Sequence, residues 1–200
     1  MFYITELPDQ PGGYVRIATS TQWEQWVRAC LSDGLDQEVR TRLVSNLKHV
    51  LVALELKAAL ITPHAQRENA PAILFEPYYH MMNFEFCVGV FSICEGLGSA
   101  NWLLENGLNG AAANLVGFNN WKLSLVNAFD PIGEAGLNAG VDVVKSVRDK
   151  LHQDRLGARE SVDWHAFSYE HAFIPAIEVL QCLLLKNEGH VPEQTNLRAG

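Results

Sequence analysis

One short segment combines the residue types of phosphodiester chemistry, Arg148-Asp149-Lys150-Leu151-His152-Gln153-Asp154-Arg155. Arg148 and His152 are four positions apart, so on a helix their side chains lean over the same surface patch. Histidine moves a proton near neutral pH, and arginine binds phosphate oxygens bidentately as negative charge builds. The pair is therefore suited to phosphodiester chemistry, with Asp149 or Asp154 able to hold the imidazole in one tautomer.

The helix that would position this segment is predicted over 138–156, ending before Gly157. Its buried stripe consists of Val144, Val147 and Leu151, which fall within a narrow arc at about 100° per residue. Arg148, His152 and Arg155 lie along one border of that stripe, with Lys145 beyond them. A partner helix or second subunit would meet these residues there, and Arg155 and Lys145 would contribute to substrate binding. The alternative is an ordinary solvated border of ion pairs.

The run Val147-Arg148-Asp149-Lys150-Leu151-His152, late in a helical bundle of this size, resembles the Arg-polar-x-x-His signature of the HEPN superfamily. Its members are helical bundles, often homodimers, and many are metal-independent ribonucleases of toxin, antiviral or RNA-processing systems. The resemblance implies that Arg148 contacts the scissile phosphate, that His152 transfers the proton and that Asp149 orients one of them, at a composite cleft between two subunits.

The spacing of the pair departs from the usual HEPN pattern. Three residues separate Arg148 from His152, fewer than in the superfamily's usual motif. Because of this departure, the alternative is that the chain is a divergent or inactive member of the superfamily, which keeps the helical bundle and serves as a binding module.

A metal site is the third alternative. Asp149 and His152 have the i, i+3 geometry by which bundles present ligands. Further ligands could come from Glu85, Glu95, Glu170, His165 and His171. A di-iron bundle would repeat Glu-x-x-His on two helices, and the sequence contains no such motif. We therefore expect no metal and no cofactor.

Other catalytic motifs are missing from the sequence. The pairs Gly133-x-x-Gly136 and Gly107 to Gly110 lack the strand-to-helix context and the lysine of a phosphate-binding loop. No serine nucleophile elbow occurs. The segment Trp164 to His171 is rich in aromatic and imidazole side chains. It is interpreted as a packed helix start, with an aromatic-lined pocket or base-stacking surface as the alternative.

Composition limits the classes of partner. A formal charge of −8 excludes broad affinity for nucleic acid, so any RNA contact must be local, and no DNA-binding signature is present. The four cysteines, Cys30, Cys87, Cys94 and Cys182, form no CxxC pair and are expected to be free, reduced thiols. With no visible signal peptide, we expect a cytoplasmic protein that is not inserted in a membrane.

The hydrophobic periodicity predicts one all-α domain over 1–200, a bundle of about four principal helices with shorter ones. A short hairpin is expected within 1–20. The expected helices are 21–31, capped by Thr21 and Glu24; 36–61, ended by Thr62-Pro63; 76–104; 114–129; 138–156; and 162–187, capped by Ser161 and bent near Pro175. Residues 188–200 are expected to fray.

The apolar segment 84–100, interrupted by Glu85 and Glu95, falls short of the run that a membrane span needs and is predicted to be a core helix. Gly89, Gly96 and Gly98 should permit close approach of its neighbours. These expectations favour a HEPN-like homodimer that binds or cleaves RNA. A non-enzymatic helical interaction protein and, third, a metal-dependent bundle enzyme are the rivals.

Overall fold

Helices make up most of the computed structural model, which describes residues 2–6, 14–65, 76–108, 116–151 and 164–198. Its elements are β1 (Phe2–Glu6), β2 (Tyr14–Ile17), α1 (Ser20–Cys30), α2 (Gln37–Ala65), α3 (Glu76–Glu105), α4 (Phe118–Phe129), α5 (Leu137–Asp149), the 3-10 helix η2 (Trp164–Phe167), the π-helix η3 (Tyr169–Phe173), α6 (Ile174–Leu185) and the 3-10 helix η4 (Glu188–His190). The predicted all-α bundle is confirmed, and β1 pairs antiparallel with β2.

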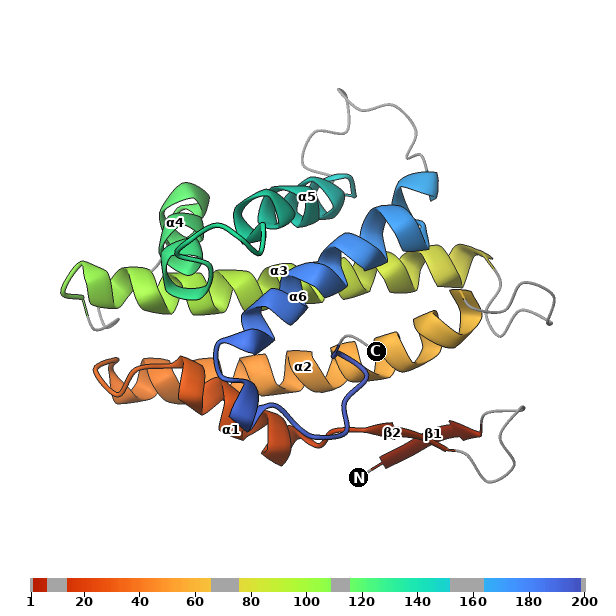
Figure 1. Ribbon diagram of the computed structural model, residues 1–200, viewed down its shortest axis with the longest axis horizontal. Helices are drawn as coiled ribbons and strands as arrows, with labels where there is room; N and C mark the ends of the chain where they lie inside the picture. The colour runs from red at the N-terminus through yellow and green to blue at the C-terminus, as the bar shows by residue number, and fades with distance from the viewer. Residues whose placement is uncertain (1, 7–13, 66–75, 109–115, 152–163, 199–200) are drawn as a thin grey trace.

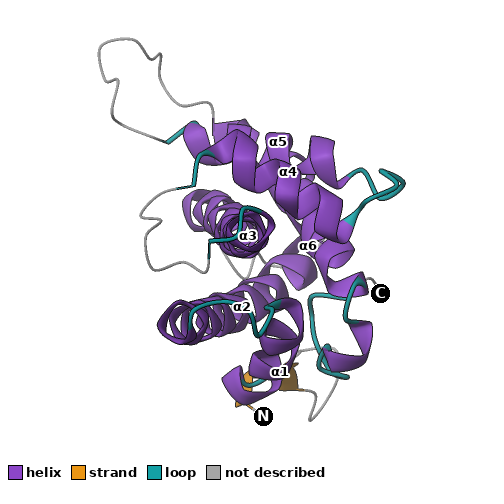
Figure 2. Ribbon diagram, turned by 90° about the vertical axis from the view of Figure 1, so that its left-hand side faces the viewer, coloured by secondary structure: helices purple, strands orange, loops and turns teal. Residues whose placement is uncertain are grey.

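Helix α3 lies at the centre of the bundle (Figure 1). Viewed from the side, α1 and α2 lie below it and α4 and α5 above it, while α6 packs along one flank (Figure 2). Contacts join α3 to α2, α4, α5, α6 and η3. The apolar side chains of α3 are therefore distributed around the helix, as expected for one buried between neighbours.

Glycines let the neighbours approach α3 closely, as predicted. A Cβ atom at Gly89 would lie 2.7 Å from Leu54 of α2, and one at Gly96 would lie 2.8 Å from Leu47. At Gly98 it would lie 2.4 Å from the backbone oxygen of Trp121 in α4. Backbone cannot move aside as a flexible side chain can, so Gly98 sets the distance between α3 and α4.

By length and composition alone, α3 could also cross a membrane. The most apolar stretch of 18 residues within Pro77–Glu105 has a mean hydropathy of 1.3, so the expectation that this region falls short of a membrane span is wrong. The same composition is typical of a core helix, and half of this 18-residue stretch is buried inside the molecule.

The start of α1 and the end of α2 differ from the prediction. The cap of α1 is Thr19, whose hydroxyl accepts from the N–H of Gln22, in place of Thr21 and Glu24. Helix α2 continues past Pro63 to Ala65, because the proline φ angle fits a helix and only one backbone hydrogen bond is lost.

The last helical segment is divided where a single helix was predicted. Ser161 lies outside the described residues, and Ser168 caps the segment by accepting from the N–H of His171. The π-helix η3 changes to α6 next to Pro175, which occupies the first turn of α6 and lacks the N–H that the preceding turn would otherwise bond.

The predicted fraying of 188–200 is wrong for the part that the structure describes. Val191 and Leu197 are buried in the core. The carboxylate of Glu55, on α2 and fully buried, accepts hydrogen bonds from the hydroxyl of Thr195 and from the backbone and side-chain N–H groups of Asn196. These hydrogen bonds offset the loss of hydration of the buried carboxylate, and they hold the C-terminal segment against α2.

Replacing Gly98 by alanine should destabilise the fold by about 1–3 kcal/mol, because the new Cβ collides with the Trp121 backbone. Urea unfolding measures this loss. Gly189→Ala is the control, since nothing lies within 4 Å of a Cβ there. Equal stability of the two variants would contradict the close contact of α3 and α4.

The Glu55 carboxyl should make stability depend on pH. Burial raises its pKa above 4.5, although the hydrogen bonds from Thr195, Asn196 and Ala18 oppose the rise. Above pH 4.5 the unfolded chain therefore loses this proton before the folded chain does, so stability falls as the pH rises through this window. We expect the unfolding free energy of wild type minus that of Glu55→Gln to decrease between pH 4.5 and 7. An increase would show that the folded pKa is lowered instead.

Candidate functional site

Helix α5 carries the candidate residues and is anchored at both its start and its buried face. The carboxylate of Asp130 accepts from the N–H of Ala135 at 3.2 Å and from that of Leu137 at 3.0 Å. Val144 and Val147 are buried as predicted, and Leu151, just beyond the helix, packs against the core. The helix ends at Asp149, earlier than the predicted residue 156. Arg148 therefore stands in the last turn.

Asp149 bridges the two candidate cations of α5. One carboxylate oxygen accepts from Nζ of Lys145, and the other lies 2.9 Å from Nη1 of Arg148. Burial opposes ionisation of this carboxyl, but the hydrogen bonds and charges of Lys145 and Arg148 outweigh it and lower the pKa of Asp149. All three side chains keep about a third of their surface exposed. Asp149 is thus ionised and fixes the spacing of two accessible cations.

Aromatic rings from α3 and α4 lie beneath these cations. The guanidinium carbon of Arg148 is 5.0 Å from the ring centre of Phe91, and Nζ of Lys145 is 5.2 Å from that of Phe118. The two rings are stacked, with centres 6.4 Å apart and planes at 9°. Cation–π attraction of about 0.5–1 kcal/mol at such exposed positions helps to orient each cation.

A third cation joins from α4. Nζ of Lys122 lies 5.8 Å from the Phe118 ring centre and 2.7 Å from the carboxylate of Asp142. We call Lys122, Lys145, Arg148, Asp149 and the two rings, Phe91 and Phe118, the α5 cation cluster. Counting Asp142, it holds three positive and two negative charges.

The structure brings together three of the five residues singled out from the sequence, namely Arg148, Asp149 and Lys145. His152 and Arg155 lie outside the described residues. The sequence argument missed Lys122 and both phenylalanines, because they stand on other helices and nothing in their local pattern marks them. Only the packing of α3, α4 and α5 reveals the cluster.

The described residues offer little to a metal ion. Among them, no group of three or more histidine, cysteine, aspartate or glutamate side chains is close enough to hold one. The carboxylate of Asp149 faces two cations, and Glu85 pairs with Lys57 at 3.1 Å. The alternative of a metal-dependent enzyme gains no support from this part of the chain.

The aromatic segment starting at Trp164 is packed only in part. Phe167 and Phe173 are buried, and their rings contact Phe84 and Phe86 of α3. Trp164 is 44% exposed, and His165, Glu170 and His171 are exposed as well, so the predicted packing of Trp164 to His171 is observed around Phe167 but not at the ends of the segment. The ring of His165 stands 6.4 Å from that of His80, between centres.

Buried tyrosine and cysteine side chains elsewhere in the bundle do not lose their protons near neutral pH. Burial, with the nearby Tyr169 and Glu170, raises the pKa of Tyr79 to about 12. The four cysteines are free, as predicted, and burial raises the pKa of Cys87 to about 12. Neither a tyrosinate nor a reactive thiolate is available there.

No family model matches the chain, and neither the curated proteins nor the solved structures compared with it contain a match.

Asp149→Asn should lower stability by about 0.5–1 kcal/mol at pH 7, because it removes the charge that pairs with Lys145 and Arg148. The lowered pKa of Asp149 means that its contribution is present above the ordinary value of 3.8 and is lost as the pH falls through the folded value. Urea unfolding at pH 7 and at pH 3 should therefore show a difference that shrinks at low pH. Asp142→Asn loses only the pair with Lys122, in which the carboxylate is more exposed than that of Asp149, so it should have a smaller effect. A deficit unchanged at pH 3 would refute the electrostatic role.

Proposed function

We propose that this chain is a HEPN-like RNA-binding protein that contacts the RNA backbone through the α5 cation cluster. The observation that carries the proposal is that Asp149 holds Lys145 and Arg148 side by side, above stacked aromatic rings. This arrangement stands on the helix that leads to His152. Cations with fixed spacing recognise phosphates at lower entropic cost than freely moving ones do.

Arg148 is the expected primary phosphate contact. A guanidinium presents its N–H donors in a planar fork that matches phosphate oxygens, whereas Lys145 contributes a point charge. The Phe91 ring supports the guanidinium carbon from below. Recognition of phosphates alone carries no base specificity, so this surface would select RNA by shape or through single-stranded segments.

The catalytic form of the proposal adds His152. The 2′-oxygen of the RNA would bond to the adjacent phosphorus while the bond to the 5′-oxygen breaks, giving a 2′,3′-cyclic phosphate and a 5′-hydroxyl. His152 would take the proton of the 2′-hydroxyl and return one to the leaving oxygen, and Arg148 would stabilise the negative charge on the non-bridging phosphate oxygens. This chemistry needs no metal. In a homodimer, two copies of the segment would form a composite cleft.

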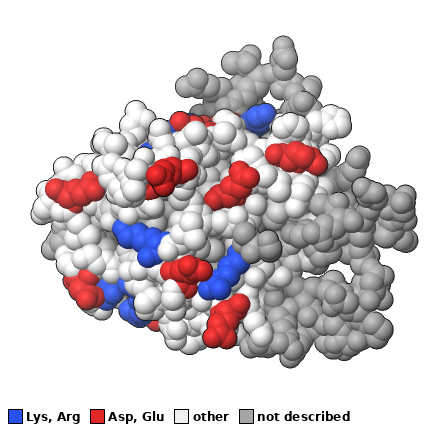
Figure 3. Space-filling view, in the orientation of Figure 1, with Lys and Arg blue, Asp and Glu red and all other residues white. Residues whose placement is uncertain are grey.

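A non-enzymatic helical interaction protein is the second candidate, and the local charge balance favours it. The α5 cation cluster has only one more positive than negative charge, and the whole chain carries −8. Acidic and basic side chains alternate on the face shown in Figure 3, where the coloured residues form no broad basic patch. In this form the ion pairs would serve a protein interface.

Binding is tested with fluorescein-labelled single-stranded RNA, by anisotropy at 50 and 150 mM salt. Arg148→Ala and Lys145→Ala should each weaken binding several-fold and reduce the salt slope by about one. Arg28→Ala is the matched control, since Arg28 forms a similar exposed i, i+4 pair with Glu24 on α1. Equal losses of RNA affinity in all three variants would show that binding responds only to the overall charge of the protein and would contradict the proposed site.

Cleavage is tested in chelator with wild type and His152→Ala. Chelator-resistant formation of a 2′,3′-cyclic phosphate that is lost in the variant supports the catalytic form. Binding without cleavage restricts the protein to RNA binding. If the protein neither binds nor cleaves RNA, and Arg148→Ala changes its oligomeric state in solution, then it is a non-enzymatic interaction protein.

A further inference from the structure

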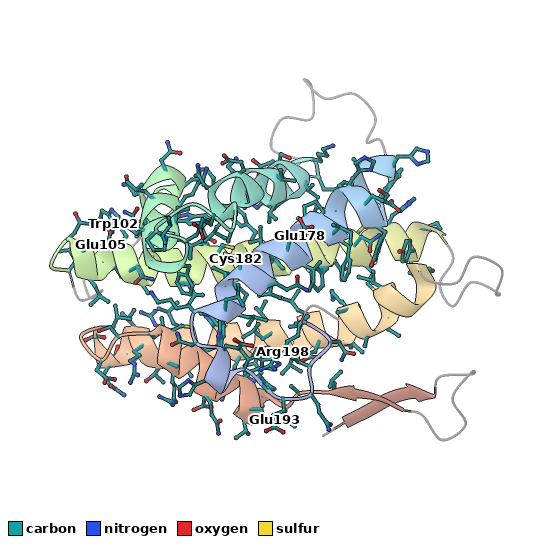
Figure 4. The ribbon with its side chains drawn as sticks, viewed as in Figure 1. Trp102, Glu105, Glu178, Cys182, Glu193 and Arg198 are labelled. Atoms are coloured by element: carbon teal, nitrogen blue, oxygen red, sulfur yellow. The ribbon has the colours of Figure 1, made fainter. Side chains whose placement is uncertain are left out.

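A cavity of about 480 Å³ lies away from the α5 cation cluster, between α6, η4 and the C-terminal segment. Figure 4 shows Glu178 and Cys182 of α6 on the same face as Arg198 of the C-terminal segment. The cavity is large enough for a small organic molecule, since such sites measure roughly 300–1,000 Å³. The proposed RNA function does not use it.

The walls of this cavity are mainly apolar. Cys182, Leu184 and Val191 line it and are at least nine-tenths buried, while Leu185 stands at the entrance with 65% of its surface exposed. An exposed leucine beside a hollow leaves apolar area for a ligand to cover. The thiol of Cys182 does not supply reactivity, because burial and the charge of Asp130 raise its pKa.

The charged groups of the lining are mostly acidic. Glu178 and Glu188 contribute two carboxyl groups, and Arg198 contributes one guanidinium. Nη2 of Arg198 donates to the backbone oxygens of Glu188 and Val191, at 3.4 and 3.3 Å, so this cation is directed toward the C-terminal segment itself. In the described part of the chain, the side chains of Glu178 and Glu188 belong to no ion pair.

We propose that this cavity binds a small organic cation, an apolar body that carries a protonated amine. The apolar body would cover Leu185 and contact Leu184 and Val191 on the cavity wall, and the ammonium group would pair with Glu178. A neutral ligand would leave that carboxylate without a charged partner, and an anionic one would be repelled by both acids. The net negative charge of the lining therefore selects a cation.

Glu178 also borders a second hollow, of about 360 Å³, which lies between the start of α5 and α6. Gly140 and Val179 meet there, and Val143 lies at its edge. The ligand is assigned to the larger cavity because Leu185 and Val191 belong to that one alone. Methyl groups of the two hollows distinguish the sites experimentally.

The test compares three probes of one shape, namely hexylammonium, hexanol and hexanoate, by titration calorimetry and methyl NMR at pH 7. The amine is protonated at this pH, as a lysine side chain is. Hexylammonium should bind most tightly, with one site per chain, and should shift the methyl resonances of Leu184, Leu185 and Val191. Equal or tighter binding of hexanoate, no binding of any probe, or shifts confined to Val143 and Val179 would overturn the proposal.

Two charge variants complete the test. Glu178→Gln should weaken hexylammonium binding about fivefold, the effect of losing one partly exposed ion pair, while hexanol binding stays the same. Glu193→Gln removes the same charge from an exposed position of the C-terminal segment that does not line the cavity, and it should change the affinity less than twofold (Figure 4). Equal effects of the two variants would show a response to overall charge and refute the site.

Discussion

The close packing of α3 against its neighbours is the constraint on which the rest of the molecule depends. Leu54 and Leu47 of α2 occupy the space that side chains would fill at Gly89 and Gly96, and the α4 backbone occupies it at Gly98. Each glycine costs helix propensity of roughly 1 kcal/mol relative to alanine, so the contacts must offset that cost. The result is a central helix that holds α2 on one side and α4 on the other.

This packing also makes the α5 cation cluster. Phe91 projects from α3 and Phe118 from α4, and their stacking depends on the distance that Gly98 allows. Asp130 then starts α5 at a defined place by accepting from the backbone N–H of Ala135, just before the helix, and from that of Leu137, its first residue. The cations of α5 consequently lie over rings that belong to two other helices. A site of this kind is a property of the assembled bundle and of no single segment.

The long helices were predictable because their apolar periodicity extends over many turns, so local errors average out. Helix caps were less predictable: Thr19 and Thr21 are equally good capping residues, and the structure uses Thr19, whose capping box is completed by Gln22. For the site, the order of Lys145, Arg148 and Asp149 along one helix sufficed to group them. The aromatic rings beneath them could not be inferred, since Phe91 and Phe118 look like any other core residues in the sequence.

Glu55 illustrates the same limit and has a further consequence for how the chain is made. A glutamate in an amphipathic helix normally faces solvent, yet this one is buried and two of its donors, Thr195 and Asn196, lie 140 and 141 residues later. At roughly 5–20 residues per second, a ribosome needs on the order of ten seconds to supply them. During that interval α2 carries a carboxylate at a core position without Thr195 or Asn196. A nascent chain can therefore assemble the α2–α3 pair early, but it completes its core only after the distant C-terminal segment has left the ribosome.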